Sequence, residues 1–460
     1  MKEKQLLDLG VDPDDIEFAQ ELVEKARAKG LNKKKINRQL QLAVQKPEAN
    51  FTNPYFGVLA KKVYQDRRFK ERKEPAPWKI WGEDLPDQAV LQMKNACRLP
   101  ISWRGALMAD AHQGYGLPIG GVLATENAVI PYAVGVDIAC RVKMTVFDSP
   151  AEDVDKNKDF LIETLQKDTL FGIGKTFSKP HDHPVLQEDW SFSKVTKHIK
   201  PRAIKQLGSS GSGNHFVEFG ELTISQDTLG LQAGTYLAVL SHSGSRGAGS
   251  AVANHYSQLA MKLRPGLPKE LEHLAWLSLD SEEGQEYWAA MELMGRYAAA
   301  NHHIIHKKII KSLGAKPLLQ IENHHNFAWK EVHDGKELIV HRKGATPAGK
   351  GDLGIIPGSM VNSCYVVRGK GDETSLSSAP HGAGRVMSRR KAKQSFNWTD
   401  VNQMIKSKNV TLLSAGLDEA PGVYKDIDMV MEYSNDLVEI LACFQPRIVK
   451  MAEDGERPED

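Results

Sequence analysis

The chain has 460 residues, with 60 lysines and arginines against 58 aspartates and glutamates, a net charge of +2. This length permits roughly two to four domains, or one large α/β domain with an appendage, and the near-neutral balance argues against a general nucleic-acid coat, so any polyanion must be held by local basic patches. The four cysteines, Cys97, Cys140, Cys364 and Cys443, form no Cys-x-x-Cys pair, which argues against a zinc ribbon or a disulfide framework and indicates reduced thiols.

The N-terminal part is predicted to be helical and highly charged. Residues 12–30 are expected to form a helix that Asp12 caps, with Pro13 in its first turn and Gly30 at its end. A second helix is expected over residues 33–44. The N-terminus carries no apolar segment typical of a secretory signal, so we expect a cytoplasmic protein.

The composition changes at residues 75–77, which read Pro-Ala-Pro. We therefore predict a helical, charged extension over residues 1–75 and a main domain over residues 76–460. In the main domain, short β-type runs such as Thr235–Leu240 and Glu337–His341 alternate with glycine-rich turns. This alternation is typical of a mixed α and β fold.

The longest nearly apolar run covers residues 128–136 and is broken by Pro131. It is too short to cross a bilayer, so we expect no membrane contact. We interpret the run as a strand that delivers Asp137 and Cys140 into one loop. A carboxylate and a thiolate three residues apart suit a divalent transition metal.

Two runs of glycine and serine follow, at residues 208–215 and 243–249, and the second contains Arg246. Their backbone N–H groups would suit an anion-binding nest, and the guanidinium adds a fork-shaped cation. Neither run ends in the Gly-Lys-Ser/Thr of a P-loop, so we reject a P-loop NTPase. A flexible turn is the plainer interpretation of each run taken singly.

The longest helix is expected from about residue 281 to residue 312, with Gly314 at its end. It carries His302 and His306 at an i,i+4 spacing that would suit a metal. Because no acidic residue occupies the position used in zinc metalloproteases, we do not expect these histidines to be ligands.

Three other histidines, His215, His242 and His325, lie in loop-like contexts and would serve as imidazole donors. With a carboxylate and a thiolate they form a donor set that favours a transition ion over magnesium, and a thiolate can bridge two such ions. Mn, Zn, Co and Fe all satisfy this argument. Each histidine taken singly is more typical of a hydrogen-bonded turn residue, because the proposed ligands are scattered along the chain.

Near the C-terminal end, His381 lies between a proline and a Gly-Ala-Gly turn and is followed by Arg385, Arg389 and Arg390. Imidazole is a good nucleophile near neutral pH, and flanking glycines let a ring nitrogen approach a phosphate. The pattern predicts phosphorus chemistry at His381, with an ordinary surface turn as the alternative.

Taken together, these segments resemble the RtcB family of RNA-splicing ligases, with the motifs in the family's order over residues from about 85 to 460. The matching motifs are DAHQGYGLPIGGV, GVDIACR, GSGNHFVEF, SHSGSRG, HHNFAW, HRKGATPA, PGSM, HGAGRVMSR and EAPGVYKDID. The resemblance implies a ligase that joins an RNA 3′-phosphate or 2′,3′-cyclic phosphate to a 5′-hydroxyl end, in tRNA splicing or RNA repair, using GTP and two manganese ions. It also implies the family's own α/β fold around a deep metal and nucleotide cleft, not a doubly wound Rossmann sheet, and in some lineages an archease-type activator.

The resemblance also assigns roles to individual residues. His381 would be the nucleophile that takes up GMP as a phosphoramidate, and Asp110 looks like a further acidic residue near the site without an assigned role. Asp137, Cys140 and His215 would hold one manganese ion, and Cys140, His242 and His325 the other. The guanylate would lie against Asn214, His215, Phe216, Val217, Glu218, His325, Asn326, Pro357, Gly358, Ser359, Met360, Cys364, His381, Gly382, Ala383, Gly384 and Lys450.

The chain departs from the family's pattern at two positions. Arg141 follows the bridging cysteine where the family often has glycine, and could add a phosphate contact; Cys364 stands where a serine is frequent, and could weaken one hydrogen bond to guanine. A binuclear metallophosphatase acting on RNA ends, which would need no GTP, is the alternative function. We interpret the cations of the extension as a solvated helical face, with an extended RNA track as the alternative; they are Lys33, Lys34, Lys35, Arg67 and Arg68.

Overall fold

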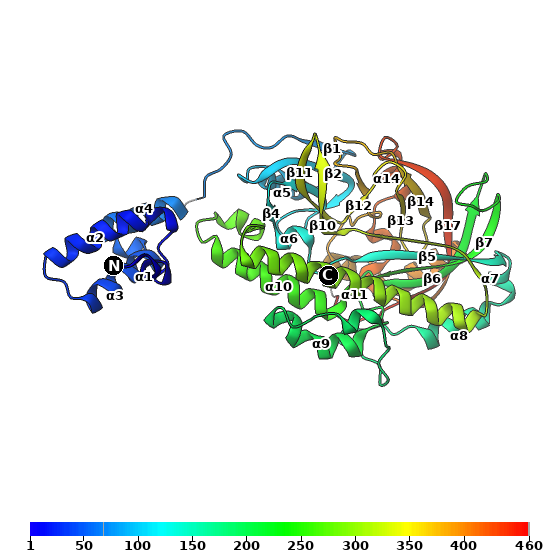
Figure 1. The fold of residues 1–460 in the computed structure, drawn as a ribbon. Helices are drawn as coiled ribbons and strands as arrows, with labels where there is room; N and C mark the ends of the chain where they lie inside the picture. Colours follow the sequence, from blue (N-terminus) through cyan, green and yellow to red (C-terminus); the bar gives the residue numbers. More distant parts are fainter. Residues whose placement is uncertain (68, 459–460) are drawn as a thin grey trace. The chain divides into compact units, whose positions relative to one another are not determined.

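The computed structural model describes residues 1–67 and 69–458, without the side chains of residues 65–67 (Figure 1). It comprises two compact units, one made of Met1–Lys70 with Arg264–Pro268 and the other of Glu71–Leu263 with Lys269–Asp460. The composition-based boundary at residue 75 lies slightly beyond this division. In the part of the chain that the structure describes, no helix is both long and apolar enough to cross a membrane.

The first unit is helical and has its own apolar core. Its helices are α1 (Glu3–Asp8), α2 (Ile16–Ala28), α3 (Lys33–Gln45) and α4 (Gly57–Arg67). Their apolar faces meet in a cluster that includes Ala19, Val23, Ile36, Leu40 and Phe56. The second predicted helix is confirmed as α3. Asn32 caps it by accepting a hydrogen bond from the backbone N–H of Lys35.

The first predicted helix begins later than expected. Asp12 accepts a hydrogen bond from the backbone N–H of Asp14, which shapes Pro13–Asp15 into a 3₁₀ turn, and α2 starts only at Ile16. Gly30 has φ +86 and ends the segment as predicted. Of the cations in this unit, Lys33, Lys34 and Lys35 are exposed, whereas the side chain of Arg67 and all of Arg68 lie outside the described residues.

The second unit is built on a large, mostly antiparallel sheet in the order β13-β14-β17-β6-β7-β5-β9, with β16 beside β17 (Figure 1). The two edge strands of this sheet approach each other, since the Asn323 amide of β9 exchanges hydrogen bonds with both backbone groups of Ile355 in β13, so the sheet is curled. Apolar side chains such as Met144, Leu240 and Val366 fill its concave side. The strands are β5 (Arg141–Pro150), β6 (Phe216–Ile224), β7 (Gly234–Ser243), β9 (Pro317–His324), β13 (Leu353–Pro357), β14 (Cys364–Gly369), β16 (Thr411–Ser414) and β17 (Val438–Met451).

A second sheet has five strands in the order β1-β2-β3-β11-β10. Its apolar face packs with Ile356 of β13 and with the C-terminal residues Ile427 and Val430. Because β10 follows β9 directly in the chain, the two sheets meet around His325. The strands are β1 (Trp78–Ile80), β2 (Ser102–His112), β3 (Ile119–Thr125), β10 (Asn326–His333) and β11 (Lys336–Lys343).

Helices cover the other face of the large sheet. Leu161 of α8 and Ile305 of α11 pack against Val217 and Val239, and α9, α10 and α11 lie in one layer (Figure 1). The predicted long helix is confirmed: α11 spans Glu282–Leu313 and Gly314 closes it with φ +60. The other helices of this layer are α8 (Lys158–Asp168), α9 (Lys194–Gln206) and α10 (Arg246–Leu263).

The prediction of a strand over residues 128–136 was wrong. Only Ala128–Val129 forms a short strand (β4), and Pro131–Val134 forms one helical turn (α6). Proline suits the first helical position because its ring presets φ and because no N–H donor is needed there. Strand β5 follows the loop that carries Asp137 and Cys140 instead of preceding it. The remaining elements are α5 (Asp87–Cys97), α7 (Asp153–Lys156), β8 (Leu277–Ser278), β12 (Ala345–Pro347), β15 (Ser378–Pro380), α12 (Arg389–Ser395), α13 (Trp398–Ser407), α14 (Ile427–Glu432) and the 3₁₀ turns Glu48–Asn50, Pro184–Gln187, Lys269–Leu274, Leu417–Glu419 and Pro421–Val423.

Candidate metal and nucleotide site

The antiparallel order of the large sheet brings the scattered ligand candidates to one end of it. Strand β5 lies between β7 and β9, and its first residue, Arg141, pairs with Ser243 near the end of β7 and with His324 at the end of β9. The start of β5 and the ends of β7 and β9 therefore lie side by side at one end of the sheet. The residues brought together in this way are Cys140, His242 and His325.

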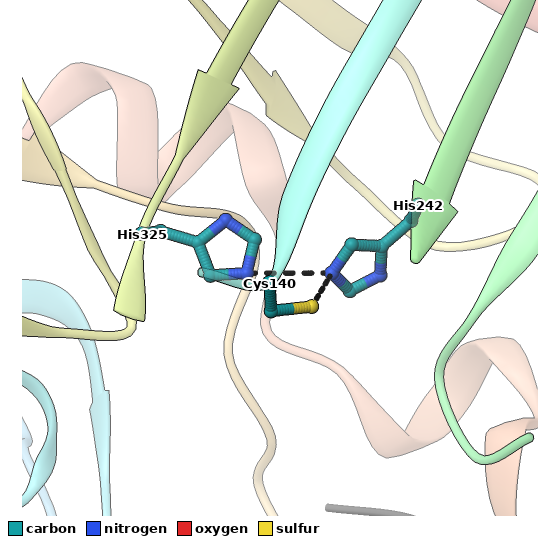
Figure 2. Close-up of side chains that lie close together, drawn as sticks. All are labelled: Cys140, His242 and His325. Carbon is teal, nitrogen blue, oxygen red and sulfur yellow. Dashed lines mark hydrogen bonds between the residues drawn. The ribbon is translucent and has the colours of Figure 1, made fainter. Parts of the chain in front are cut away.

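These three side chains converge on one point (Figure 2). The Nε2 atom of His242 lies 3.1 Å from Sγ of Cys140 and 3.3 Å from Nε2 of His325. The Nδ1 atom of His242 donates to the carbonyl oxygen of Asn214 at 3.0 Å, which leaves the Nε2 lone pair directed at the other two groups. Burial lowers the pKa of both His242 and His325 well below the usual range, so both imidazoles are neutral donors.

A second group shares the same thiol. His215, which directly precedes β6, has Nε2 3.1 Å from Oδ2 of Asp137 and 3.4 Å from Sγ of Cys140. The other carboxylate oxygen of Asp137 accepts from the backbone N–H of Ser245 at 3.0 Å. This approach requires glycine at 244, because a Cβ there would come within 2.0 Å of the carboxylate.

The charge of Asp137 is maintained by its neighbours. Burial alone would raise the pKa of Asp137, but the hydrogen bond from His215 and the nearby Arg246 guanidinium lower it to about 2. Arg246 adopts φ +56, and its Nη1 lies 3.2 Å from Nδ1 of His215. The guanidinium packs so closely on Gly211 that a Cβ there would come within 2.1 Å of it. The glycine and serine runs thus seat Arg246 against a metal-ligand candidate, and its guanidinium does not stand free for phosphate.

The two groups fit a pair of transition ions that share the Cys140 thiolate. Within each group all ligand atoms lie within 4.8 Å of one another, and all five residues are buried. Donors around an ion bound at about 2.0 to 2.3 Å lie about 3 to 4 Å apart, which agrees with the separations within both groups. Three imidazoles, a thiolate and a carboxylate are ligands that borderline transition ions prefer; they are Asp137, Cys140, His215, His242 and His325.

His381 lies beside this donor set, directly after β15. Its ring centroid is 4.9 Å from that of His325. One carboxylate oxygen of Asp110, on β2, accepts from Nδ1 of His381 at 2.6 Å and from its backbone N–H at 3.1 Å. Asp110 is 0% exposed, and its hydrogen bond holds the ring with Nδ1 toward the carboxylate and Nε2 on the opposite side of the ring. The sequence assigns no role to Asp110, because no spacing pattern links residues so far apart in the chain.

The donor set and His381 line one cavity of about 700 Å³ between the two sheets. The turns after β13 and β15 form part of its wall. Most residues expected to contact a guanylate are brought together here. They are Asn214, His215, Phe216, Glu218, His325, Asn326, Pro357, Gly358, Ser359, Met360, Cys364, His381, Gly382, Ala383 and Gly384.

Two residues expected at the guanylate do not line the cavity. Alternation along β6 turns Val217 to the face covered by helices, where it packs with Phe219. Lys450 on β17 pairs with Val217 and points the same way. Its ammonium donates to the carbonyl oxygens of Leu165 and Gln166 in α8, at 3.0 and 3.3 Å.

Glu218 and Cys364 form a polar patch on the concave side of the large sheet. Burial raises the pKa of the Glu218 carboxyl well above its usual range, and it raises the pKa of the Cys364 thiol in the same way. The Asn326 amide is used internally, since it donates to the Asp137 carbonyl at 3.2 Å and accepts from the Gly344 N–H at 2.8 Å. Asn326 therefore fixes the loop that carries Asp137 as well as lining the cavity.

Several arginine side chains form ion pairs with carboxylates of this chain. Arg141 forms an ion pair with the half-buried Glu322 and donates to the Gly295 carbonyl at 3.1 Å, so its guanidinium is used within the protein and the suggested phosphate contact stays a prediction. Arg385 and Arg389 line the cavity, and both pair with the buried Glu419. Their positions are therefore set by a carboxylate before any ligand arrives.

His302 and His306 on α11 lie outside the two ligand groups and form hydrogen bonds of their own. A ring nitrogen of each histidine is hydrogen-bonded to the Ser241 hydroxyl, at 2.7 Å for His302 and 2.8 Å for His306. The other ring nitrogen of His306 is hydrogen-bonded to the Thr145 hydroxyl at 2.7 Å. Burial lowers the pKa of His302 to about 3. This neutral network anchors α11 to β7 and β5.

Lys343 is a cavity residue that sequence analysis missed. It is the last residue of β11, and burial lowers the pKa of its ammonium to about 7. Its Nζ donates to the carbonyl oxygen of Tyr115 at 2.5 Å. The sequence offered one indication, the run His-Arg-Lys at the end of an otherwise apolar strand. Three successive polar residues at such a place need polar partners if they are buried.

Comparisons with known proteins gave matches over most of the chain. A family model described as tRNA-splicing ligase RtcB matches residues 92–189 and 186–451. The chain is 33% identical over 401 residues to the RNA-splicing ligase RtcB of Escherichia coli (strain K12), a match that covers 80% of this chain and 95% of that protein. It is 30% identical over 462 residues to the tRNA-splicing ligase RtcB of Nanoarchaeum equitans, covering 82% and 95%, and 32% identical over 417 residues to the RNA-splicing ligase RtcB homolog 1 of Entamoeba dispar, covering 75% and 77%. The motif resemblance is thereby confirmed: this chain belongs to the RtcB family of RNA-splicing ligases.

Proposed function

We propose that this chain is a GTP-dependent RNA ligase of the cytoplasm. It joins an RNA end carrying a 3′-phosphate or a 2′,3′-cyclic phosphate to a 5′-hydroxyl end, in tRNA splicing or RNA repair. The observation that carries the proposal is the position of His381, whose Nδ1 is held by a buried carboxylate 2.6 Å away and whose ring lies 4.9 Å from that of His325, a metal-ligand candidate. A preset nucleophile next to a metal site suits nucleotidyl transfer.

His381 is the nucleophile in this proposal. Asp110 keeps the proton on Nδ1, so the Nε2 lone pair attacks the α-phosphorus of GTP, an N–P bond forms, and the bond to pyrophosphate breaks. As the ring acquires positive charge, the Asp110 carboxylate stabilises it. Two manganese ions, when bound, would supply Lewis-acid stabilisation of charge on the phosphate oxygens. Asp137, Cys140 and His215 would hold one of them, and Cys140, His242 and His325 the other.

Glu218 provides a means to select guanine. Guanine presents two N–H donors side by side, and an ionised carboxylate can accept from both. The carboxyl is buried and its pKa is raised by burial, so pairing with those donors would relieve the unfavourable desolvation. Adenine lacks this donor pair, which gives the site a reason to prefer GTP to ATP.

The later steps use the same cavity. A cyclic phosphate is first opened by water, and the GMP group then passes from His381 to the RNA 3′-phosphate. The 5′-hydroxyl of the second RNA end attacks the activated 3′-phosphate, and GMP leaves as the phosphodiester forms. Arg385, Arg389 and Lys343 line the cavity and would neutralise charge on the RNA phosphates during these steps. An archease-type activator is a further proposed partner, and sustained turnover by the purified chain alone would show it to be dispensable.

The decisive experiment is incubation of the chain with α-labelled GTP and Mn²⁺, with wild type beside His381→Ala. The proposal requires an acid-labile, alkali-stable label on wild type only. A label on the His381→Ala variant would remove His381 from this role. If wild type binds manganese, stays unlabelled and still removes phosphate from RNA ends, the function is that of a binuclear metallophosphatase.

A further inference from the structure

One exposed aromatic ring stands out in the cavity wall. Tyr115 lines the cavity and is nevertheless 67% exposed, so it lies at the mouth. It belongs to the connection between β2 and β3 in the five-stranded sheet. Glu218 and Cys364, proposed for guanine, lie on β6 and β14 of the large sheet. The two walls of the cavity therefore carry different recognition groups.

The loop that carries Tyr115 is held rigidly. The Gln92 side chain accepts from the N–H of Gly114 at 3.0 Å and donates to its carbonyl oxygen. The Lys343 ammonium donates to the carbonyl oxygen of Tyr115. Gly116 has φ +70, and a Cβ there would come within 2.6 Å of the backbone oxygen of His273. These contacts present the ring in a fixed place, so a ligand need not order the loop on binding.

Tyr115 is part of a row of rings. It packs edge-to-face with His273 at 5.9 Å between centroids, and Tyr132, which also lines the cavity, packs against His273 at 4.8 Å. The perpendicular contact with His273 restrains the Tyr115 ring, while its exposure leaves ring area open for a planar ligand. An exposed, fixed tyrosine beside a cavity that takes RNA ends is suited to stacking on a nucleobase.

We propose that Tyr115 is a stacking platform for a base of the RNA next to the reacting end. This inference rests on the proposed ligase function and adds a base-binding subsite on the wall opposite the guanine patch. Stacking needs only the π-face of a base, so the subsite accepts any of the four bases and positions the end without reading sequence. The hydrogen bond from the Lys343 ammonium to the Tyr115 carbonyl oxygen connects the platform to a buried residue of the cavity wall.

The test uses the full chain with Tyr115→Ala, Tyr115→Leu and, as the matched control, Tyr115→Phe. RNAs carry 2-aminopurine at the terminal nucleotide, in one set at a 3′-phosphate end and in the other at a 5′-hydroxyl end. We expect wild type and Tyr115→Phe to quench the fluorophore in one set. The alanine and leucine variants should lose that quenching and bind that RNA about 5- to 150-fold more weakly. An abasic terminal nucleotide should weaken wild type by a similar factor and leave Tyr115→Ala unaffected.

Labelling with α-labelled GTP separates this inference from the proposed function. The platform requires that Tyr115→Ala be labelled as fast as wild type and melt at the same temperature, because an exposed ring serves neither guanine nor the core. If wild type is not labelled, the ligase function fails. If wild type is labelled and ligates but Tyr115→Ala binds RNA normally, or loses labelling, or responds to the abasic RNA as wild type does, the platform is refuted while the ligase function stands.

Discussion

Replacing Asp110 with asparagine removes one negative charge and leaves the shape of the side chain nearly unchanged. The Oδ2 atom accepts from both Nδ1 and the backbone N–H of His381, whereas Oδ1 has no partner among the described residues. An asparagine would therefore place its carbonyl oxygen at the Oδ2 position, where it satisfies both donors, and its amide group at the empty position. The histidine tautomer is kept, and only the charge that stabilises the cationic ring is lost.

A hydrogen bond to a charged group contributes about 1.5 to 3 kcal/mol, which corresponds to about 10- to 150-fold in rate. We therefore expect Asp110→Asn to slow single-turnover labelling by α-labelled GTP by that factor. Asp110→Ala should be slower still, because it leaves two donors of His381 without an acceptor. Asp148→Asn, at an exposed position of β5, is the control and should label at the wild-type rate. Wild-type labelling by Asp110→Asn would refute the stabilisation of the cationic ring by the Asp110 charge. A loss of bound manganese in that variant would also count against it, because the slower labelling would then follow from the metal site.

Three further outcomes are expected. Cys140→Ala should lose manganese from both groups, measured by elemental analysis after dialysis, while Cys97→Ala should retain it; undiminished metal in Cys140→Ala would contradict bridging. Burial would raise the pKa of Glu331, but its bonds to His333 and Arg342 lower it to about 2. The ionised carboxylate therefore stabilises the folded state by about 3 kcal/mol. This stabilisation is present above the unfolded pKa near 4.5 and is lost as the pH falls toward 2. Glu331→Gln should lower the free energy of unfolding at neutral pH and flatten its acid dependence in urea titrations; an unchanged slope would show that other groups govern it. Lys34→Glu places a favourable charge at the N-terminus of α3 and should slow hydrogen exchange of the α3 amides about 2- to 5-fold, whereas faster exchange would count against the dipole argument.

Residues that are close in the chain account for what could be predicted directly. The end of α11 at Gly314 and the start of α3 after Asn32 depend on local backbone geometry and capping, which neighbouring residues specify. The family resemblance likewise rests on short, contiguous motifs, and the donor chemistry of Asp137 and Cys140 follows from their residue types. The error at residues 128–136 shows the limit of this approach, since an apolar run with an internal proline suits either a strand or a helical turn.

Contacts between distant residues needed the folded chain. Cys140, His242 and His325 meet because β5 pairs antiparallel with both β7 and β9, and no spacing along the chain encodes that register. Strand alternation separates Glu218, which lines the cavity, from Lys450, which the motifs had assigned to the same ligand. Residue types and local order thus predict which atoms this protein has for binding metal and phosphate, whereas sheet pairing and burial determine which of those atoms meet, because both depend on packing between segments that lie far apart in the chain.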